Sequence, residues 1–104
     1  MFRVFRTEWY EKKLPKLSHQ EKKRVLKFEQ DLKQNPYLGK PLGYEFFREK
    51  KFNGKRLYFL VYEQHNAVFL ITISGKKAQQ EVIDVIKANL DAYKEQLERI
   101  LKNI

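Results

Sequence analysis

Basic side chains gather in two short stretches of the sequence, and each stretch contains a glycine. In the first, residues 48–51 (REKK) precede Asn53-Gly54, and Lys55 and Arg56 follow it. In the second, Lys76 and Lys77 come directly after Ser74-Gly75. Cations bind phosphate groups, and arginine does so best because its planar fork can bond two oxygens at once. Both stretches are therefore candidate anion-binding segments.

Asn53-Gly54 determines how the first stretch is arranged. Asn-Gly is the preferred centre of a two-residue type I′ hairpin, which places Lys51 opposite Arg56 and Glu49 opposite Tyr58. Two cations directly across a strand pair repel each other and destabilise the hairpin. A bound anion would relieve that repulsion. The alternative is that Glu49 neutralises the patch and the hairpin tip is simply solvated.

The other chemistry-bearing residues do not form a recognisable site. There are no cysteines, which excludes disulfides, thiol nucleophiles and Cys-based zinc sites. His19 in the first turn of a helix and His65 in a turn are expected to be solvated. The carboxylates lack metal-ligand spacing, no nucleophile elbow is present, and residues 74–77 lack the frame of a P-loop. We therefore expect no metal site and no small-molecule cofactor.

The charge of the chain limits its partners. It has 104 residues, as expected for one domain (1–104), and a net charge of +9. Residues 78–104 carry four basic and five acidic side chains, so the basic excess lies in the first 77 residues. The natural complement is a polyanion or an acidic protein; a Lys-rich solvated surface is the alternative. Neither a run of apolar residues long enough to span a membrane nor a signal peptide is present, so we expect a cytoplasmic protein without membrane contact.

The residue pattern predicts the elements that must position these cations. Alternation in residues 2–6 predicts a strand. Thr7 can cap a helix over 8–14 that Pro15 ends, and Ser18 with Glu21 forms a capping box that opens a helix over 19–34. Two prolines and two glycines in residues 36–45 predict a loop. Strands are then predicted at 46–52, 55–63 and 67–74, and one long amphipathic helix at 77–102.

Strands and helices are segregated along the chain, which is typical of an α+β fold. We predict an antiparallel four-stranded sheet, mixed through the N-terminal strand. Two N-terminal helices and a long C-terminal helix should pack on this sheet. The nearly continuous apolar run at 67–74 indicates an interior strand that is covered on both faces.

Three segments together resemble the RelE/ParE toxins of type II toxin–antitoxin systems, in particular their HigB-like branch. Residues 48–59, REKKFNGKRLYF, resemble the stretch L-R-E-x-R-F … G-x-Y-R-I-Y-Y of that family. Residues 70–79, LITISGKKAQ, resemble its I-V-L-L-x-G-F-x-K-K-T-Q, and residues 39–42, GKPL, resemble the K-P-L-G before its second strand. The resemblance spans about residues 25–93 and implies a RelE-like fold.

The resemblance also implies a function and partners. Members of this superfamily are ribosome-dependent mRNA endonucleases or, in the ParE branch, gyrase poisons, and both are neutralised by a cognate antitoxin. This chain would then be a toxin that cleaves mRNA on the ribosome. Its antitoxin is expected to be acidic and encoded by an adjacent gene. A gyrase-binding toxin and a non-catalytic RNA- or ribosome-binding domain are the alternatives.

Basic residues of neighbouring strands, and one after the last strand, hold the mRNA in the nucleases of this family. Metal-free cleavage needs a base for the 2′-hydroxyl proton, cations for the charge on the phosphorane, and an acid for the leaving 5′-oxygen. By position, Arg56 would hold the phosphate, Lys51 would be the base, and Lys77 would be the acid or a second phosphate contact. The other expected RNA-binding residues are Arg48, Lys50, Lys55, Lys76 and Tyr58, the last by stacking on a base.

Two departures from the family pattern bear on catalysis. Lys77 stands where some members have an arginine that acts as the acid, and Ile83 stands where they have a tyrosine. Tyr93, further along the last predicted helix, is a candidate substitute, because some HigB-like proteins use a late tyrosine.

Overall fold

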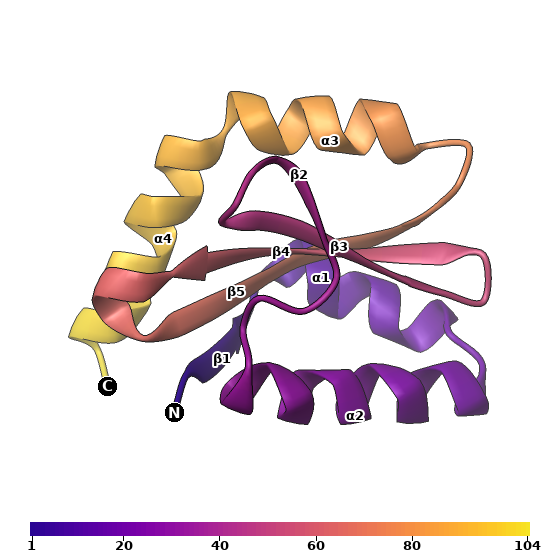
Figure 1. Ribbon diagram of the computed structural model, residues 1–104, viewed down its shortest axis with the longest axis horizontal. Coiled ribbons are helices and arrows are strands. Elements are labelled where there is room, and N and C mark those ends of the chain that lie inside the picture. Colours follow the sequence, from indigo (N-terminus) through magenta and orange to yellow (C-terminus); the bar gives the residue numbers. More distant parts are fainter.

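A computed structural model describes all residues, 1–104, and shows a five-stranded mixed sheet with helices on both faces (Figure 1). The strand order is β1-β5-β4-β3-β2, with β1 parallel to β5 and every other pair antiparallel. Helices α1 and α2 lie on one face of the sheet, and α3 and α4 lie on the other. In chain order the elements are β1 (Arg3–Arg6), α1 (Glu8–Lys13), η1 (Leu14–Lys16), α2 (His19–Gln34), β2 (Lys40–Tyr44), β3 (Phe47–Phe52), β4 (Lys55–Tyr62), η2 (Glu63–His65), β5 (Ala67–Gly75), α3 (Gln79–Ala88) and α4 (Leu90–Lys102).

The N-terminal helices begin where the capping residues predict. The Thr7 hydroxyl accepts a hydrogen bond from the backbone N–H of Tyr10 at 3.0 Å. Ser18 and Glu21 form the reciprocal capping box that opens α2, with bonds of 3.2 and 2.9 Å. Each cap satisfies backbone donors that a helix start otherwise leaves unpaired. The α-helical part of the first helix ends at Lys13, and Pro15 lies in the short 3-10 helix that follows.

The hairpin register predicted from Asn53-Gly54 is confirmed. Both turn residues have positive φ, 47° and 73°, as a type I′ turn requires. Lys51 pairs with Arg56 and Glu49 pairs with Tyr58. Because alternate residues of a strand point to opposite faces, this register assigns each cation of the hairpin to a face of the sheet.

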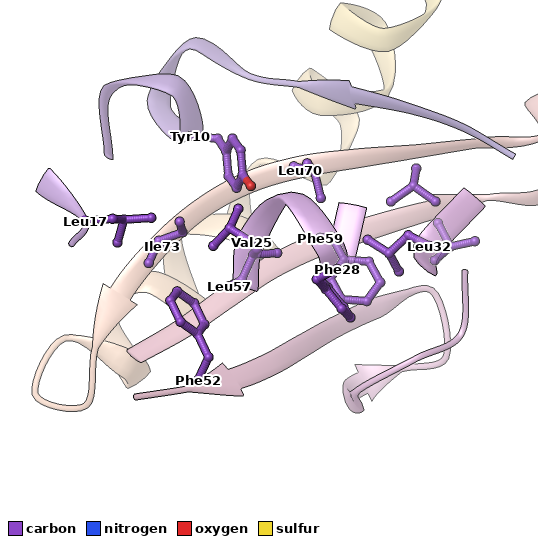
Figure 2. Close-up of a cluster of buried hydrophobic side chains, with 12 residues drawn as sticks. Tyr10, Leu17, Val25, Phe28, Leu32, Phe52, Leu57, Phe59, Leu70 and Ile73 are labelled. Carbon is purple, nitrogen blue, oxygen red and sulfur yellow. The ribbon is translucent and has the colours of Figure 1, made fainter. Parts of the chain in front are cut away.

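Two hydrophobic clusters hold the sheet between its helices. The cluster on the α1/α2 face is drawn in Figure 2, where Phe28 of α2 meets Phe59 of β4 edge-on with ring centroids 5.7 Å apart. The cluster on the α3/α4 face includes Ile86 and Leu97, both fully buried. Residues 67–73 of β5 are buried, which confirms the expected strand covered on both faces.

The prediction of four strands was wrong, because the segment assigned to a loop contains β2. This edge strand pairs Lys40 with Glu49 and Pro41 with Arg48, and its register shifts before Tyr44. Proline is tolerated on an edge strand because no neighbour needs its missing N–H. Gly39, directly before β2, and Gly43, within it, both have positive φ, 78° and 88°, which glycine adopts without steric cost.

The prediction of one long C-terminal helix was also wrong, because the chain turns at Asn89 between α3 and α4 (Figure 1). Asn89 leaves the helical region at φ −123°, and its backbone N–H bonds to the carbonyl of Ile86. Its side-chain amide donates to the carbonyl of Val85 at 2.7 Å. These two bonds satisfy carbonyls at the end of α3. The turn lets the apolar faces of both helices follow the sheet. No helix of the chain is both long and apolar enough to cross a membrane.

Candidate functional site

Arg56 lies at the centre of a polar cluster on the α3/α4 face of the sheet. Its side chain is largely buried, and its Nε lies 3.4 Å from the Glu49 carboxylate. That Nε is buried without a hydrogen bond, whereas the two terminal nitrogens of the guanidinium are neither bonded to the protein nor enclosed by it. Arg56 is therefore held by charge at one end while its fork remains open to a ligand.

Glu49 is itself fixed by the first residue of α3. Glu49 is 2% exposed, and the side-chain amide of Gln79 donates to both of its carboxylate oxygens at 3.3 and 3.0 Å. A buried carboxylate needs such partners to remain charged. The hairpin register predicts Glu49 on this face, whereas the contact of Gln79 depends on the path of residues 76–78 and has no local signal in the sequence.

Tyr58 and Ser74 complete the cluster, which we call the Arg56 cluster (Glu49, Arg56, Tyr58, Ser74 and Gln79). The two hydroxyls are 2.9 Å apart, and Ser74 donates to the carbonyl of Gly75, so Tyr58 donates to Ser74. Burial is the largest influence on the pKa of Tyr58 and raises it. The phenol therefore stays protonated. Its ring is fully buried in this structure, so stacking on an RNA base would require Tyr58 to become exposed.

Exposed lysines adjoin the Arg56 cluster in the strand register and along the chain. Lys51 faces Arg56 across the hairpin. Lys76 and Lys77 lie in the connection from β5 to α3. This connection is fixed at both ends, because Gly75 pairs with Lys55 and Gln79 contacts Glu49. The structure thus brings Arg56, Lys51, Lys76 and Lys77 to one region, where four cations are accompanied by the one buried carboxylate of the cluster. Such an arrangement favours a bound anion.

The remaining predicted cations of β3 and β4 lie on the opposite face, so they do not join this cluster. The Lys55 ammonium donates to both oxygens of Glu21 at 2.8 Å. The Lys50 ammonium lies 5.7 Å from the centre of the Phe28 ring. Both positions follow from strand alternation relative to Arg56 and Lys51. The structure therefore divides the predicted RNA-binding cations between the two faces of the sheet.

Arg48 also points to the α1/α2 face and is 6% exposed. Its guanidinium donates to the backbone carbonyls of Leu38 and Gly39 at 2.9 and 3.2 Å and to the Glu45 carboxylate at 2.8 Å. These bonds tie the segments on either side of β2 to β3. In this structure Arg48 is a structural residue whose donors are occupied.

Tyr93 lies in the core rather than beside Arg56. Its ring meets Phe69 edge-on at 6.5 Å, and burial raises its pKa. Phe69 pairs with Leu60, four residues along β4 from Arg56, which corresponds to roughly 13 Å. The structure therefore does not bring Tyr93 into the cluster. No group of three or more His, Asp or Glu side chains is arranged to hold a metal ion.

Solved structures of RelE toxins share this architecture. No protein-family model and no curated protein sequence matches the chain. The isolated E. coli RelE toxin aligns with a TM-score of 0.65 and 19% identity, covering 83% of this chain and 99% of that one. The RelBE2 toxin–antitoxin complex of Mycobacterium tuberculosis aligns with a TM-score of 0.63 and 24% identity, covering 72% and 98%. The archaeal RelE–RelB complex of Pyrococcus horikoshii aligns with a TM-score of 0.63 and 17% identity, covering 72% and 94%. The chain therefore has the α+β fold of RelE toxins.

Proposed function

We propose that this protein is the toxin of a type II toxin–antitoxin module and that it cleaves mRNA on the ribosome without a metal ion. The observation that carries the proposal is Arg56, whose guanidinium is clamped by Glu49 while its terminal nitrogens stay open among exposed lysines. The RelE toxin fold supports the same conclusion. The motif at residues 70–79 supports a position in the HigB-like branch.

The reaction would be an attack of the RNA 2′-oxygen on the adjacent phosphorus. Lys51 would take the 2′-hydroxyl proton, the new bond to phosphorus would form a 2′,3′-cyclic phosphate, and the bond to the 5′-oxygen would break. Lys77 would donate a proton to that leaving oxygen. Arg56 would bind two phosphate oxygens and stabilise the charge that builds on them, which is the largest contribution expected from such a site.

Glu49 and Gln79 act as positioning residues in this scheme. They fix the plane of the Arg56 guanidinium before RNA binds, so less side-chain entropy is lost on binding. Glu49 also attracts Arg56 away from the phosphate, but Lys51, Lys76 and Lys77 keep the region positive overall.

An acidic antitoxin would be the natural partner of this basic chain. Complementary charge raises association rates and selects partners, and the net charge here is +9. RelE toxins with the same fold have been solved in complex with antitoxins of the RelB type. Both the toxin and its complex would function in the cytoplasm, where translation occurs.

Expression without the antitoxin tests the proposal. We expect growth arrest and new RNA ends within translated regions, and both should be lost in Arg56→Ala. The matched control is Arg99→Ala, an exposed arginine of α4, which should remain toxic. DNA breaks with intact mRNA would instead indicate a gyrase poison, and arrest without any nucleic-acid cleavage would indicate a non-catalytic ribosome binder.

A further inference from the structure

A second cationic site lies on the face of the sheet opposite the Arg56 cluster. A hollow of about 410 Å³ opens between α2 and β3. Its cationic lining residues are Arg24, Lys27, Lys50 and Lys51, and its floor includes the rings of Phe28 and Phe52. The volume is at the lower end of the range of small-molecule binding pockets.

The hollow is cationic because the carboxylates of α2 are already paired. Asp31, the one acidic residue of the lining, is bonded to Lys27 at 2.6 Å. Glu21 and Glu29 point inward, where they pair with Lys55 and Arg6. Lys23, one helical turn before Lys27 on α2, is also exposed. The surface around the hollow therefore presents cations with little opposing charge.

Lys51 connects the hollow to the Arg56 cluster. Strand β2 pairs with β3 only along Phe47–Glu49, so from Lys50 to Phe52 strand β3 forms the edge of the sheet. Lys51 lines the hollow at this edge and also faces Arg56 across the hairpin. Cations thus continue from the Arg56 cluster, around the open edge of β3, into the hollow.

We propose that this hollow binds the phosphate backbone of the same RNA strand whose reacting phosphodiester lies at Arg56. The inference rests on the proposed function, because that function identifies the anion as RNA. An acidic peptide is less well matched to the hollow. Phe28 and Phe52 are only 7% and 9% exposed, so a peptide would bury little apolar surface there, whereas the cations suit a polyanion. The hollow would hold nucleotides that flank the cleaved bond and so set the length of RNA recognised.

Binding of RNA that cannot be cleaved tests the hollow independently of catalysis. We would measure fluorescence anisotropy with single strands of about 4 and about 16 nucleotides, a span typical of single-strand sites, carrying 2′-O-methyl groups that remove the nucleophile. The variant is Lys27→Gln/Lys50→Gln. The control is Lys94→Gln/Lys102→Gln, which removes the same charge from exposed positions of α4.

The hollow variant should weaken binding of the long strand and lower the slope of log Kd against log salt by about 1.4, since each single-strand phosphate contact contributes about 0.7. The short strand should bind the hollow variant and the control equally. Equal long-strand affinity and slope in the two variants would overturn the proposal. The proposal would also be overturned if the hollow variant lost binding to a polyglutamate peptide while its RNA binding stayed unchanged. That result would assign the hollow to an acidic protein. If the unsubstituted protein shows no nuclease activity but the two variants differ in RNA binding as expected, only the proposed function would be contradicted.

Discussion

Arg56→Lys and Arg56→Ala separate the catalytic contribution of the guanidinium fork from its contribution to folding. In the native protein Arg56 neutralises Glu49, whose carboxylate is almost fully buried. Removing one partner of a buried ion pair costs about 3–5 kcal/mol. Because Gln79 still donates to both oxygens of Glu49, we expect Arg56→Ala to lie at the low end, about 3 kcal/mol. A domain of this size should then lose at least about 12 °C in Tm.

The effect on cleavage should be larger than this loss of stability can explain. Removing one oriented group that stabilises transition-state charge costs about 100-fold or more in rate. Arg56→Lys keeps the charge beside Glu49, so it should stay closer to wild-type stability than Arg56→Ala. A lysine is a compact point charge without the planar fork of arginine, so it cannot hold two phosphate oxygens in the same fixed bidentate geometry. We therefore expect Arg56→Lys to be folded and still strongly impaired.

The assay is ribosome-dependent cleavage of a translated mRNA at a temperature where circular dichroism shows each variant to be folded. Arg99→Lys and Arg99→Ala serve as controls, because Arg99 is exposed on α4 and exposed substitutions usually change stability by less than about 0.5 kcal/mol. Wild-type cleavage by folded Arg56→Lys would show that the fork does not hold the phosphate.

Three further predictions concern the scaffold. The Lys55 ammonium, together with the capping bond from the backbone N–H of Ser18, holds the pKa of Glu21 at about 2, below its ordinary 4.5. These contacts stabilise the fold above pH 4.5, and their contribution is lost as the pH falls towards 2. The urea midpoint should show this loss, and Lys55→Met should make it smaller. Gly39→Ala should lower the free energy of unfolding by more than about 1 kcal/mol, because φ is +78° and the new Cβ would meet the backbone carbonyl of Glu49 in β3. Gly54→Ala places its Cβ against no other atom and should lower it less. Equal urea midpoints for the two variants would contradict this expectation. Ile86 is fully buried, so Ile86→Ala should lower the free energy of unfolding measured by calorimetry by about 2–5 kcal/mol. A loss of less than about 1 kcal/mol would place this residue outside the core.

The local elements could be predicted from the sequence because their signals are short-range. The capping box at Ser18, the Asn53-Gly54 turn and the apolar run of β5 each depend on neighbouring residues, and each was found in the structure. The hairpin register also follows locally, so the pairing of Lys51 with Arg56 could be derived before any coordinates.

The features that were missed depend on contacts between distant segments. Strand β2 exists because an irregular, proline-containing segment finds β3 as a partner, and local composition carries no signal for that pairing. The break at Asn89 reflects how α3 and α4 follow the sheet, although their apolar periodicity continues through it. The bond from Gln79 to Glu49 joins residues 30 positions apart. The division of cations between two faces, by contrast, was implied by the predicted register.

Nuclear magnetic resonance of the arginine side chains can report directly on whether the open fork of Arg56 binds a phosphodiester. The protein would be titrated with a single-stranded RNA that carries 2′-O-methyl groups and therefore cannot be cleaved. We expect the guanidinium signals of Arg56 to shift and to become protected from solvent exchange, while those of Arg99 stay unchanged. Unchanged Arg56 signals at saturating RNA would contradict this binding, whatever the other arginines show.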